Sequence, residues 1–253
     1  MHRASRVARG ALPSRPMQEE PSSPRRVSPR ARALSLQLAA EARAEWGFAT
    51  EIVARAFRED RQLSSGDRRQ VAETVYGLVR WERRLEAILD EVLARSRGRR
   101  DALSAVGRQE LKLIIYELRS GIPEAAVKAD VRRLAGRDLD LSDVASDDAG
   151  LGDRQGLDRE ALRVSYPTWL FERLAAAHGE NQAMALASAM NARAPMCVRT
   201  NTVKVSREEL VARLAEEGVV ATPTRLPNAA RTRRSTSACE TFWWMVLFAK
   251  RVR

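Results

Sequence analysis

The sequence has few of the residues that build disulfide-linked or metal-stabilised folds. It holds 2 cysteines, Cys197 and Cys239, and 2 histidines, His2 and His178, among 253 residues. Two cysteines cannot form a disulfide framework, and they suit a reducing compartment. Because the chain also has no Cys-x-x-Cys motif, no zinc site is predicted, and we expect a metal-free protein.

Aromatic residues and long apolar runs are also scarce. The aromatic content of 5% argues against a surface that stacks successive bases of a single strand. No apolar run approaches the ~20 residues that span a bilayer. The arginine-rich residues 1–30 lack the apolar core of a secretory signal. These absences favour a cytoplasmic protein without membrane contact, which we expect to be a monomer.

What the chain has in excess is positive charge. It holds 44 Lys and Arg residues against 33 Asp and Glu, which gives a formal net charge of +11. A basic balance of this size favours an anionic partner, with nucleic acid ahead of a membrane surface. Arg greatly outnumbers Lys, so part of the charge can reflect genome composition rather than selection for a ligand.

Composition divides the chain into five parts. We expect a disordered basic tail over residues 1–28, a helical domain over 29–137, an acidic linker over 138–160, an α+β region over 161–235 and an aberrant apolar tail over 236–253. The first part is either a plain leader or an arm that adds phosphate contacts. The linker is rich in Asp, Gly and Ser, and its glycines miss the spacing of a nucleotide-binding loop.

Apolar residues recur at helical spacing from Arg30 to about residue 135, which predicts six helices joined by short loops in one bundle. Thr50 is a candidate cap for the second helix, and Ser64-x-x-Asp67 resembles a capping box that begins the third. We expect a fourth helix to begin near Trp81. The fold class is therefore mostly α, with a small and incomplete α+β domain behind the bundle.

The run Arg193 to Asn201 is the most informative stretch of the second half. Pro195 ends the preceding helix, and residues 196–198 predict a short strand with polar residues at its end. One interpretation is an ordinary helix–strand–helix piece of a core, in which Cys197 is a small buried residue. The other is that Arg199, Asn201 and Lys204 face an RNA backbone.

A second helix and strand follow that run. Ser206-x-x-Glu209 predicts a capping box, and Gly218 a helix end, after which residues 219–222 predict a strand. Residues 228–234 are polar and basic and predict no further strand. We therefore expect an unfinished sheet with an exposed edge.

Two pairs of motifs resemble known families. Residues 67–80 and 111–123 resemble the NusB fold, an all-helical RNA- and protein-binding module. Tyr166-Pro-x-Trp169-Leu170 and residues 191–201 resemble the catalytic half of NOL/NOP2/Sun ribosomal-RNA methyltransferases. The order of the two blocks resembles that of the RsmB-like enzymes, which methylate carbon 5 of a cytosine in small-subunit rRNA.

The resemblance implies small-subunit rRNA as a partner. It adds Arg30 and Arg32, on the family's basic first helix, to the RNA-binding residues expected above. The family binds S-adenosylmethionine in a Rossmann-type domain and uses two cysteines in Pro-Cys and Thr-Cys contexts. Neither Cys197 nor Cys239 stands in such a context, so we expect no catalytic residue, no cofactor and no methyl transfer in this chain.

Two functions are therefore expected. The first is the RNA-binding part of a truncated rRNA methyltransferase that lacks its catalytic domain. The alternative is a stand-alone NusB-type module in transcription antitermination or ribosome assembly. The residues 193–201 favour the first, because simple NusB proteins end with the helical bundle.

Overall fold

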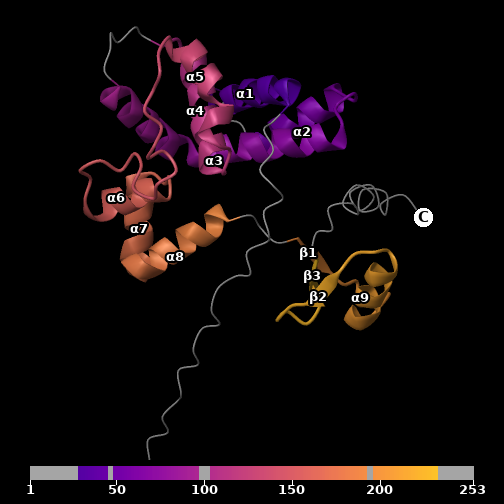
Figure 1. Ribbon diagram of the computed structural model, residues 1–253. Coiled ribbons are helices and arrows are strands. Elements are labelled where there is room, and N and C mark those ends of the chain that lie inside the picture. Colours follow the sequence, from indigo (N-terminus) through magenta and orange to yellow (C-terminus); the bar gives the residue numbers. More distant parts are fainter. Residues whose placement is uncertain (1–27, 45–47, 97–102, 193–195, 233–253) are drawn as a thin grey trace, which may run out of the picture.

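The computed structural model describes residues 28–44, 48–96, 103–192 and 196–232 (Figure 1). The expected basic tail lies outside these residues except for Ser28, and residues 233–253, with Cys239, lie outside them entirely. Helices dominate the described part, and a small antiparallel sheet lies near its C-terminal end, with one helix between its first and second strands. The predicted fold class, mostly α with a small α+β part, is confirmed.

The helices of the first half are α1 (Pro29–Ala44), α2 (Ala49–Glu59), α3 (Ser65–Arg95), α4 (Ala105–Arg119), the 3-10 turn η1 (Glu124–Ala126) and α5 (Lys128–Ala135). The second half contains α6 (Gly156–Arg163), α7 (Thr168–His178), α8 (Glu180–Asn191), β1 (Cys197–Arg199), α9 (Arg207–Glu216), β2 (Ala221–Pro223) and β3 (Ala229–Thr232). Among the described helices, none is long and apolar enough to cross a membrane.

Helix α3 is the axis of the helical part. The apolar pattern predicted a new helix near Trp81, but the 31 residues of α3 run without a break because neither Gly nor Pro interrupts residues 78–95. The first half of α3 packs with α1 and α2 around Val71 and Val75. Its second half packs with α4 around Leu85 and Leu89. One helix thus joins two apolar clusters.

Some of the helix ends that the sequence predicted are observed, and one is not. The Ser64 hydroxyl accepts a hydrogen bond from the Asp67 N–H at 3.0 Å, as the capping motif predicted. The prediction for α2 was wrong: Thr50 lies inside the helix, and Phe48 occupies the cap position without a side-chain bond. Residues 120–121 end α4 as expected, with Gly121 at a φ of 94°.

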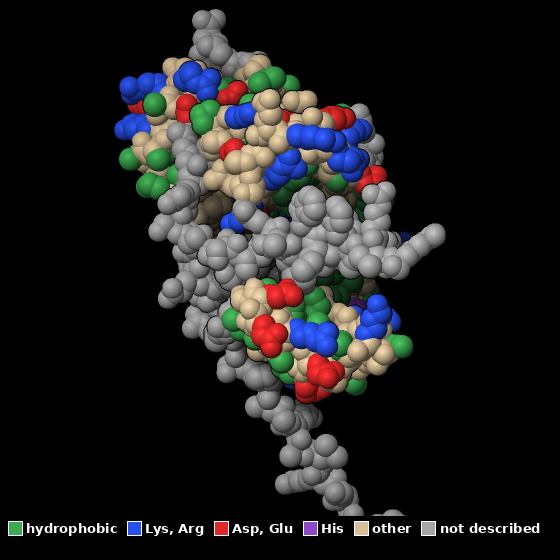
Figure 2. Space-filling model, turned by 90° about the vertical axis from the view of Figure 1, so that its right-hand side faces the viewer, with side chains coloured by type: hydrophobic (Ala, Val, Ile, Leu, Met, Phe, Trp, Pro, Cys, Tyr) green, Lys and Arg blue, Asp and Glu red, His purple; other side chains and the backbone are tan. Residues whose placement is uncertain are grey.

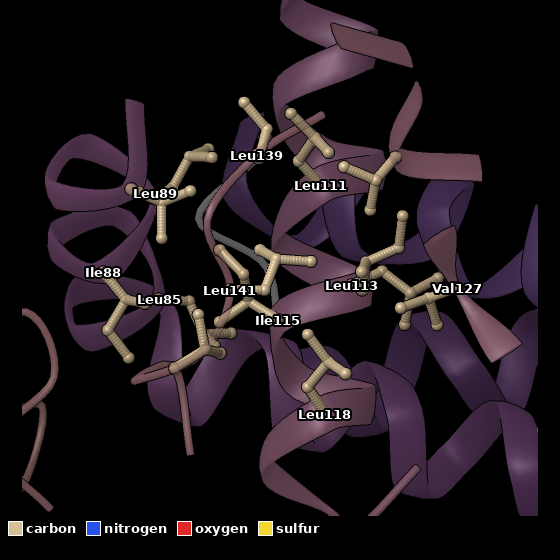
Figure 3. Close-up of a cluster of buried hydrophobic side chains, with 14 of the residues drawn as sticks. Leu85, Ile88, Leu89, Leu111, Leu113, Ile115, Leu118, Val127, Leu139 and Leu141 are labelled. Atoms are coloured by element: carbon tan, nitrogen blue, oxygen red, sulfur yellow. The ribbon is translucent and has the colours of Figure 1, made fainter. Parts of the chain in front are cut away.

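Residues 138–155 differ from the acidic linker that the sequence predicted. They form no helix, but Leu139, Leu141, Val144 and Ala149 are buried in the same cluster as residues of α3 and α4. Figure 3 shows Leu139 and Leu141 among these side chains. The aspartates that suggested a linker lie on the outside of this segment, between its apolar residues. The segment is therefore packed as part of the helical body.

Hydrogen bonds, in addition to apolar contacts, hold residues 138–155 against the helical body. Arg119 donates to the carbonyl oxygens of Val144 and Ser146 at 2.8 and 2.9 Å. The Gly150 N–H donates to the Glu91 carboxylate at 2.6 Å. Gly150 has a φ of 73°, and a Cβ there would lie 2.7 Å from the backbone nitrogen of Ile88. Only glycine allows the segment to approach α3 so closely.

Helices α6, α7 and α8 form a third cluster around Phe171, Ala183 and Ala187. The sheet follows in the order β1-β3-β2, with both pairs antiparallel. Strand β2 begins two residues later than predicted, and β3 was not predicted at all. The sequence of β3, Ala-Ala-Arg-Thr, has too little apolar contrast to show a strand period.

Candidate nucleic-acid interface

Strand β1 has one exposed face. Cys197 and Arg199 are exposed, and Val198 between them is half-buried. Successive side chains of a strand point to opposite sides, so Cys197 and Arg199 share one face of the sheet. The expectation that Cys197 is a buried core residue was wrong. Its neighbour Val198 takes the inward position, because Val198 lies opposite the fully buried Ala230.

The register of the sheet brings a second arginine to that face. Arg231 of β3 lies opposite Cys197 of β1 and opposite Thr222 of β2. Arg199 lies opposite Ala229, so the two arginines are diagonal neighbours, whose Cα atoms are about 7–8 Å apart in such a position. We call Cys197, Arg199, Thr222, Ala229 and Arg231 the open sheet face.

Sequence reasoning missed Arg231 because it missed β3. The basic composition of residues 228–234 is the usable signal, but it does not indicate a strand. Helix α9 packs on the opposite side of the sheet, where Leu214, Ala230 and Thr232 are buried. The predicted capping box fixes the start of α9: the Ser206 hydroxyl accepts from the Glu209 N–H, and the Glu209 carboxylate accepts from the Ser206 N–H.

The turn after β1 presents the other two predicted residues. The Asn201 side-chain oxygen accepts a hydrogen bond from the Val203 N–H at 3.2 Å, and its backbone oxygen accepts from the Lys204 N–H at 2.9 Å. Asn201 therefore shapes the turn through a local side-chain to backbone bond. Lys204 is exposed and has no ion-pair partner among the described residues. The structure thus brings Arg199, Asn201 and Lys204 close together in the chain's α+β part.

The two arginines predicted on α1 lie in the helical part, in different surroundings. Arg30 is 56% exposed, and its guanidinium contacts the Asp60 carboxylate at 2.6 Å. Arg32 is 14% exposed, and it contacts the nearly buried Glu117 of α4 at 2.5 Å. The Arg32 pair joins α1 to α4, so this side chain contributes to helix packing.

Three arginines of α3 hold the second half of the chain. Arg84, 2% exposed, donates to the carbonyl oxygens of Asp147, Ala149 and Arg163 at 2.7, 2.9 and 3.1 Å. Burial lowers the pKa of Arg84 to about 10, so the guanidinium stays charged at neutral pH. The three carbonyl oxygens supply the acceptors that a buried cation requires.

Arg83 and Arg80 extend this joint. Arg83 donates to the Tyr166 carbonyl oxygen, to the Thr168 hydroxyl at 2.8 Å and to the Asp158 carboxylate at 3.1 Å. Arg80 donates to the Asn191 carbonyl oxygen at 3.1 Å. The start of α7 and the end of α8 are thereby fixed on α3. Hydrogen bonds from Thr168 and Arg83 lower the pKa of Asp158, in that order of size.

The described residues offer no fit for S-adenosylmethionine. The one glycine-rich segment, residues 150–156, follows no strand, whereas a dinucleotide-type loop begins at a strand end. Its first N–H group is already bonded to Glu91, and its backbone contacts Ile88. We therefore derive no methyl-transfer step from these residues. The described residues also contain no group of three His, Cys, Asp or Glu side chains that could hold a metal ion.

Comparison with known protein families finds a match in the second half of the chain. Residues 166–236 match the family model of the ferredoxin-like domain of RsmF/B-like methyltransferases. This range contains α7, α8, β1, α9, β2 and β3, and therefore the whole open sheet face.

Two curated proteins are similar over a longer range. The chain is 29% identical over 208 residues to the Synechocystis sp. protein named "Probable ribosomal RNA small subunit methyltransferase B", covering 73% of this chain and 45% of that protein. It is 29% identical over 170 residues to the Vibrio cholerae ribosomal RNA small subunit methyltransferase B, covering 64% of this chain and 39% of that protein. The chain thus spans less than half the length of either relative.

A solved structure, that of PH0851, is 17% identical and has a TM-score of 0.48, covering 81% of this chain and 49% of that one. That score is too low to assign a fold. The family model and the two curated relatives together confirm the resemblance to RsmB-like rRNA methyltransferases that the sequence indicated.

Proposed function

We propose that this chain supplies RNA-binding surfaces of an RsmB-like rRNA methyltransferase, and that its partner is small-subunit rRNA. The observation that supports this most is the open sheet face. It places Arg199 and Arg231 on one exposed surface, within the segment similar to the ferredoxin-like domain of RsmF/B-like methyltransferases. S-adenosylmethionine and transfer to cytosine carbon 5 belong, in this proposal, to the full-length enzyme rather than to the described residues.

The chemistry of the open sheet face suits phosphate. An arginine guanidinium presents several N–H donors in a planar fork that matches phosphate oxygens. Both side chains are exposed, and neither forms an ion pair with another residue that the structure describes. Lys204 adds a third cation at the turn after β1.

The same face favours backbone contact over base stacking. Its remaining residues, Cys197, Thr222 and Ala229, are small, and none is aromatic. Stacking of successive unpaired bases relies on aromatic side chains, to which arginine only adds a cation–π contribution. We therefore propose that the open sheet face positions RNA through its phosphates and leaves base selection to other parts of the enzyme.

The predicted residues of α1 enter the proposal unequally. Arg30 remains a candidate, because more than half of its side chain is exposed beside Asp60. Arg32 is left out, because its side chain is mostly buried against Glu117. Asn201 is proposed to hold the turn that presents Lys204 rather than to contact RNA through its oxygen.

A filter-binding titration with a small-subunit rRNA fragment tests the proposal. The double variant Arg199→Gln/Arg231→Gln should weaken binding and reduce the slope of log affinity against log salt by about 1.4, since each phosphate contact on a single strand contributes about 0.7. The matched control is Arg132→Gln/Arg213→Gln, which removes the same charge from α5 and α9. Equal affinity and slope for the two double variants would refute the role of the open sheet face.

A further inference from the structure

Two loops meet at one edge of the sheet. Because β3 pairs antiparallel with both β1 and β2, the ends of β1 and β2 and the start of β3 lie at the same edge. The loop of residues 201–206 follows at the end of β1, and the loop of residues 224–228 joins β2 to β3. We call these two loops together the loop edge.

Hydrogen bonds tie the two loops to each other at both ends. The Thr200 N–H donates to the Asn228 carbonyl oxygen at 2.7 Å, just before the first loop begins. Where that loop ends, the Arg207 guanidinium donates to the Thr224 carbonyl oxygen at 3.4 Å. The two loops are therefore held next to each other.

Each loop carries a large apolar side chain that is in contact with solvent. Val203 is 94% exposed, and Leu226 is 67% exposed. Their backbones are fixed, because the Val203 N–H donates to the Asn201 side-chain oxygen and the Leu226 N–H donates to the Thr224 hydroxyl, both at 3.2 Å. Single exposed apolar residues are common on protein surfaces. Here two of them project from adjoining loops that are already ordered.

A cation stands next to each of these apolar side chains in the chain. Lys204 follows Val203, and Arg225 precedes Leu226. Both cations are exposed, and neither forms an ion pair with another residue in the described ranges. Each loop thus presents one apolar and one positively charged side chain.

The acidic residues that follow the first loop have contacts of their own. Glu208 contacts Arg207 at 3.1 Å, and the Glu209 carboxylate accepts a hydrogen bond from the Ser206 N–H at 2.8 Å. In Figure 2, which looks at the molecule from the right-hand side of Figure 1, basic, acidic and hydrophobic side chains are mixed on the α+β part. Because these glutamates offset part of the positive charge, a ligand of the loop edge needs apolar contact as well as charge.

An unpaired nucleotide meets both requirements. Its base has two apolar faces, and its phosphate is an anion. The bases of a continuous duplex cover one another's faces by stacking, so only the phosphates remain for contact. Apolar side chains such as leucine insert between the base steps of DNA and unstack them. Side chains on ordered loops lose little freedom when they make such a contact.

We propose that Val203 and Leu226 contact the bases of unpaired rRNA nucleotides. Lys204 and Arg225 contact the phosphates beside those bases. The inference rests on the proposed function, because it takes the same RNA, and it adds a base-contacting site to the phosphate contacts of the open sheet face. Arg199 ends β1 directly before the loop edge, so one strand of RNA reaches both surfaces.

The test compares two double variants that remove exposed apolar side chains and leave the charge unchanged. Val203→Ser/Leu226→Ser alters the loop edge. Val106→Ser/Val220→Ser is the matched control, because Val220 lies at the opposite edge of the sheet and Val106 lies on α4, and both are exposed. Each variant of the full chain is titrated with a hairpin RNA that has an unpaired loop, and with a continuous duplex of the same number of nucleotides.

The loop-edge variant should bind the hairpin RNA about tenfold more weakly than the wild type, because it loses the apolar contact of two side chains. Its slope of log affinity against log salt should equal that of the wild type, because no cation is removed. The control variant should bind both RNAs as the wild type does. Because Val203 is almost fully exposed, Val203→Ser alone repeats the test if circular dichroism shows that the double variant is unfolded.

The outcomes separate this inference from the proposed function. If the loop-edge variant binds the hairpin RNA as tightly as the control does, while Arg199→Gln/Arg231→Gln weakens binding, the base contact is refuted and the proposed function stands. Equal wild-type affinity for the hairpin and the duplex would also refute the base contact. If the wild type binds neither RNA at low salt, both proposals fail. Light scattering that shows a wild-type dimer and a monomeric loop-edge variant, with equal RNA affinity, would overturn the inference by making the loop edge a contact between copies of the chain.

Discussion

Arg84→Met offers the sharpest test of how the two halves of the chain are joined. The Arg84 side chain is almost fully buried, and it donates to three carbonyl oxygens, of Asp147, Ala149 and Arg163. Methionine fills most of the same space with an apolar chain, so the substitution removes the donors with little change of volume.

The magnitude follows from two opposing effects. Hydrogen bonds to a charged group contribute roughly 1.5–3 kcal/mol each, which gives roughly 5–9 kcal/mol for three. Burial of the cation costs part of this: the fall of the Arg84 pKa to about 10 corresponds to about 3 kcal/mol. The Asp147 carbonyl lies in an exposed residue and can bond to water after the change. We therefore expect a net loss of about 2–5 kcal/mol in the free energy of unfolding.

Urea unfolding followed by circular dichroism measures this loss. Arg80→Met is the matched control, because Arg80 is exposed and makes one bond, to the Asn191 carbonyl oxygen. Native-state hydrogen exchange should also show a faster Gly150 N–H in the Arg84 variant, since Gly150 follows the anchored Ala149. If Arg84→Met and Arg80→Met unfold at the same urea concentration, Arg84 does not hold residues 147–163 on α3.

Three further changes test separate contacts. Gly150→Ala should destabilise the chain by more than about 2 kcal/mol, because the added Cβ would meet the Ile88 backbone. The control Gly136→Ala has a similar φ but open space around it, and it should cost about 1 kcal/mol. Equal unfolding midpoints for the two variants would contradict the close approach of Gly150 to α3. Arg32→Gln should lower the unfolding free energy by about 1–3 kcal/mol and leave the salt slope of RNA binding unchanged; a shallower slope would return Arg32 to the RNA-binding residues. The lowered pKa of Asp158 means that its contribution to stability is present above its unfolded value of 3.8 and is lost as pH falls through the folded value. Acid titration should therefore weaken the wild type more than Asp158→Asn below about pH 4, and parallel curves would remove Asp158 from the joint.

Local signals in the sequence predicted the helical part well. Apolar spacing located α1, α2 and α4 and showed α3 as two helices, and the capping residues Ser64 and Ser206 accept the bonds that their motifs imply. These features depend on residues close in sequence, and such features can be read without the fold. Thr50 shows the limit of such predictions. It is a residue type that often caps helices, but it lies two residues after the observed cap position, Phe48.

Features that depend on distant residues escaped the sequence. Residues 138–155 looked like a solvated linker because their aspartates are frequent, yet Leu139 and Leu141 pack against α3 and α4. Strand β3 forms because β1 and β2 supply its hydrogen bonds from both sides, and its own composition gives little indication of a strand. Without β3, the position of Arg231 beside Cys197, and hence the open sheet face, could not be foreseen.

We propose that this chain binds rRNA through exposed cations of its α+β part, Arg199, Arg231 and Lys204. The most direct measurement is the affinity of the unmodified chain for a small-subunit rRNA fragment over a series of salt concentrations. Contacts from Arg199, Arg231 and Lys204 together predict a fall of affinity with salt, with a slope of log affinity against log salt near −2 for about three contacts. An affinity that stays constant across the series, or no binding at the lowest salt, would contradict the account.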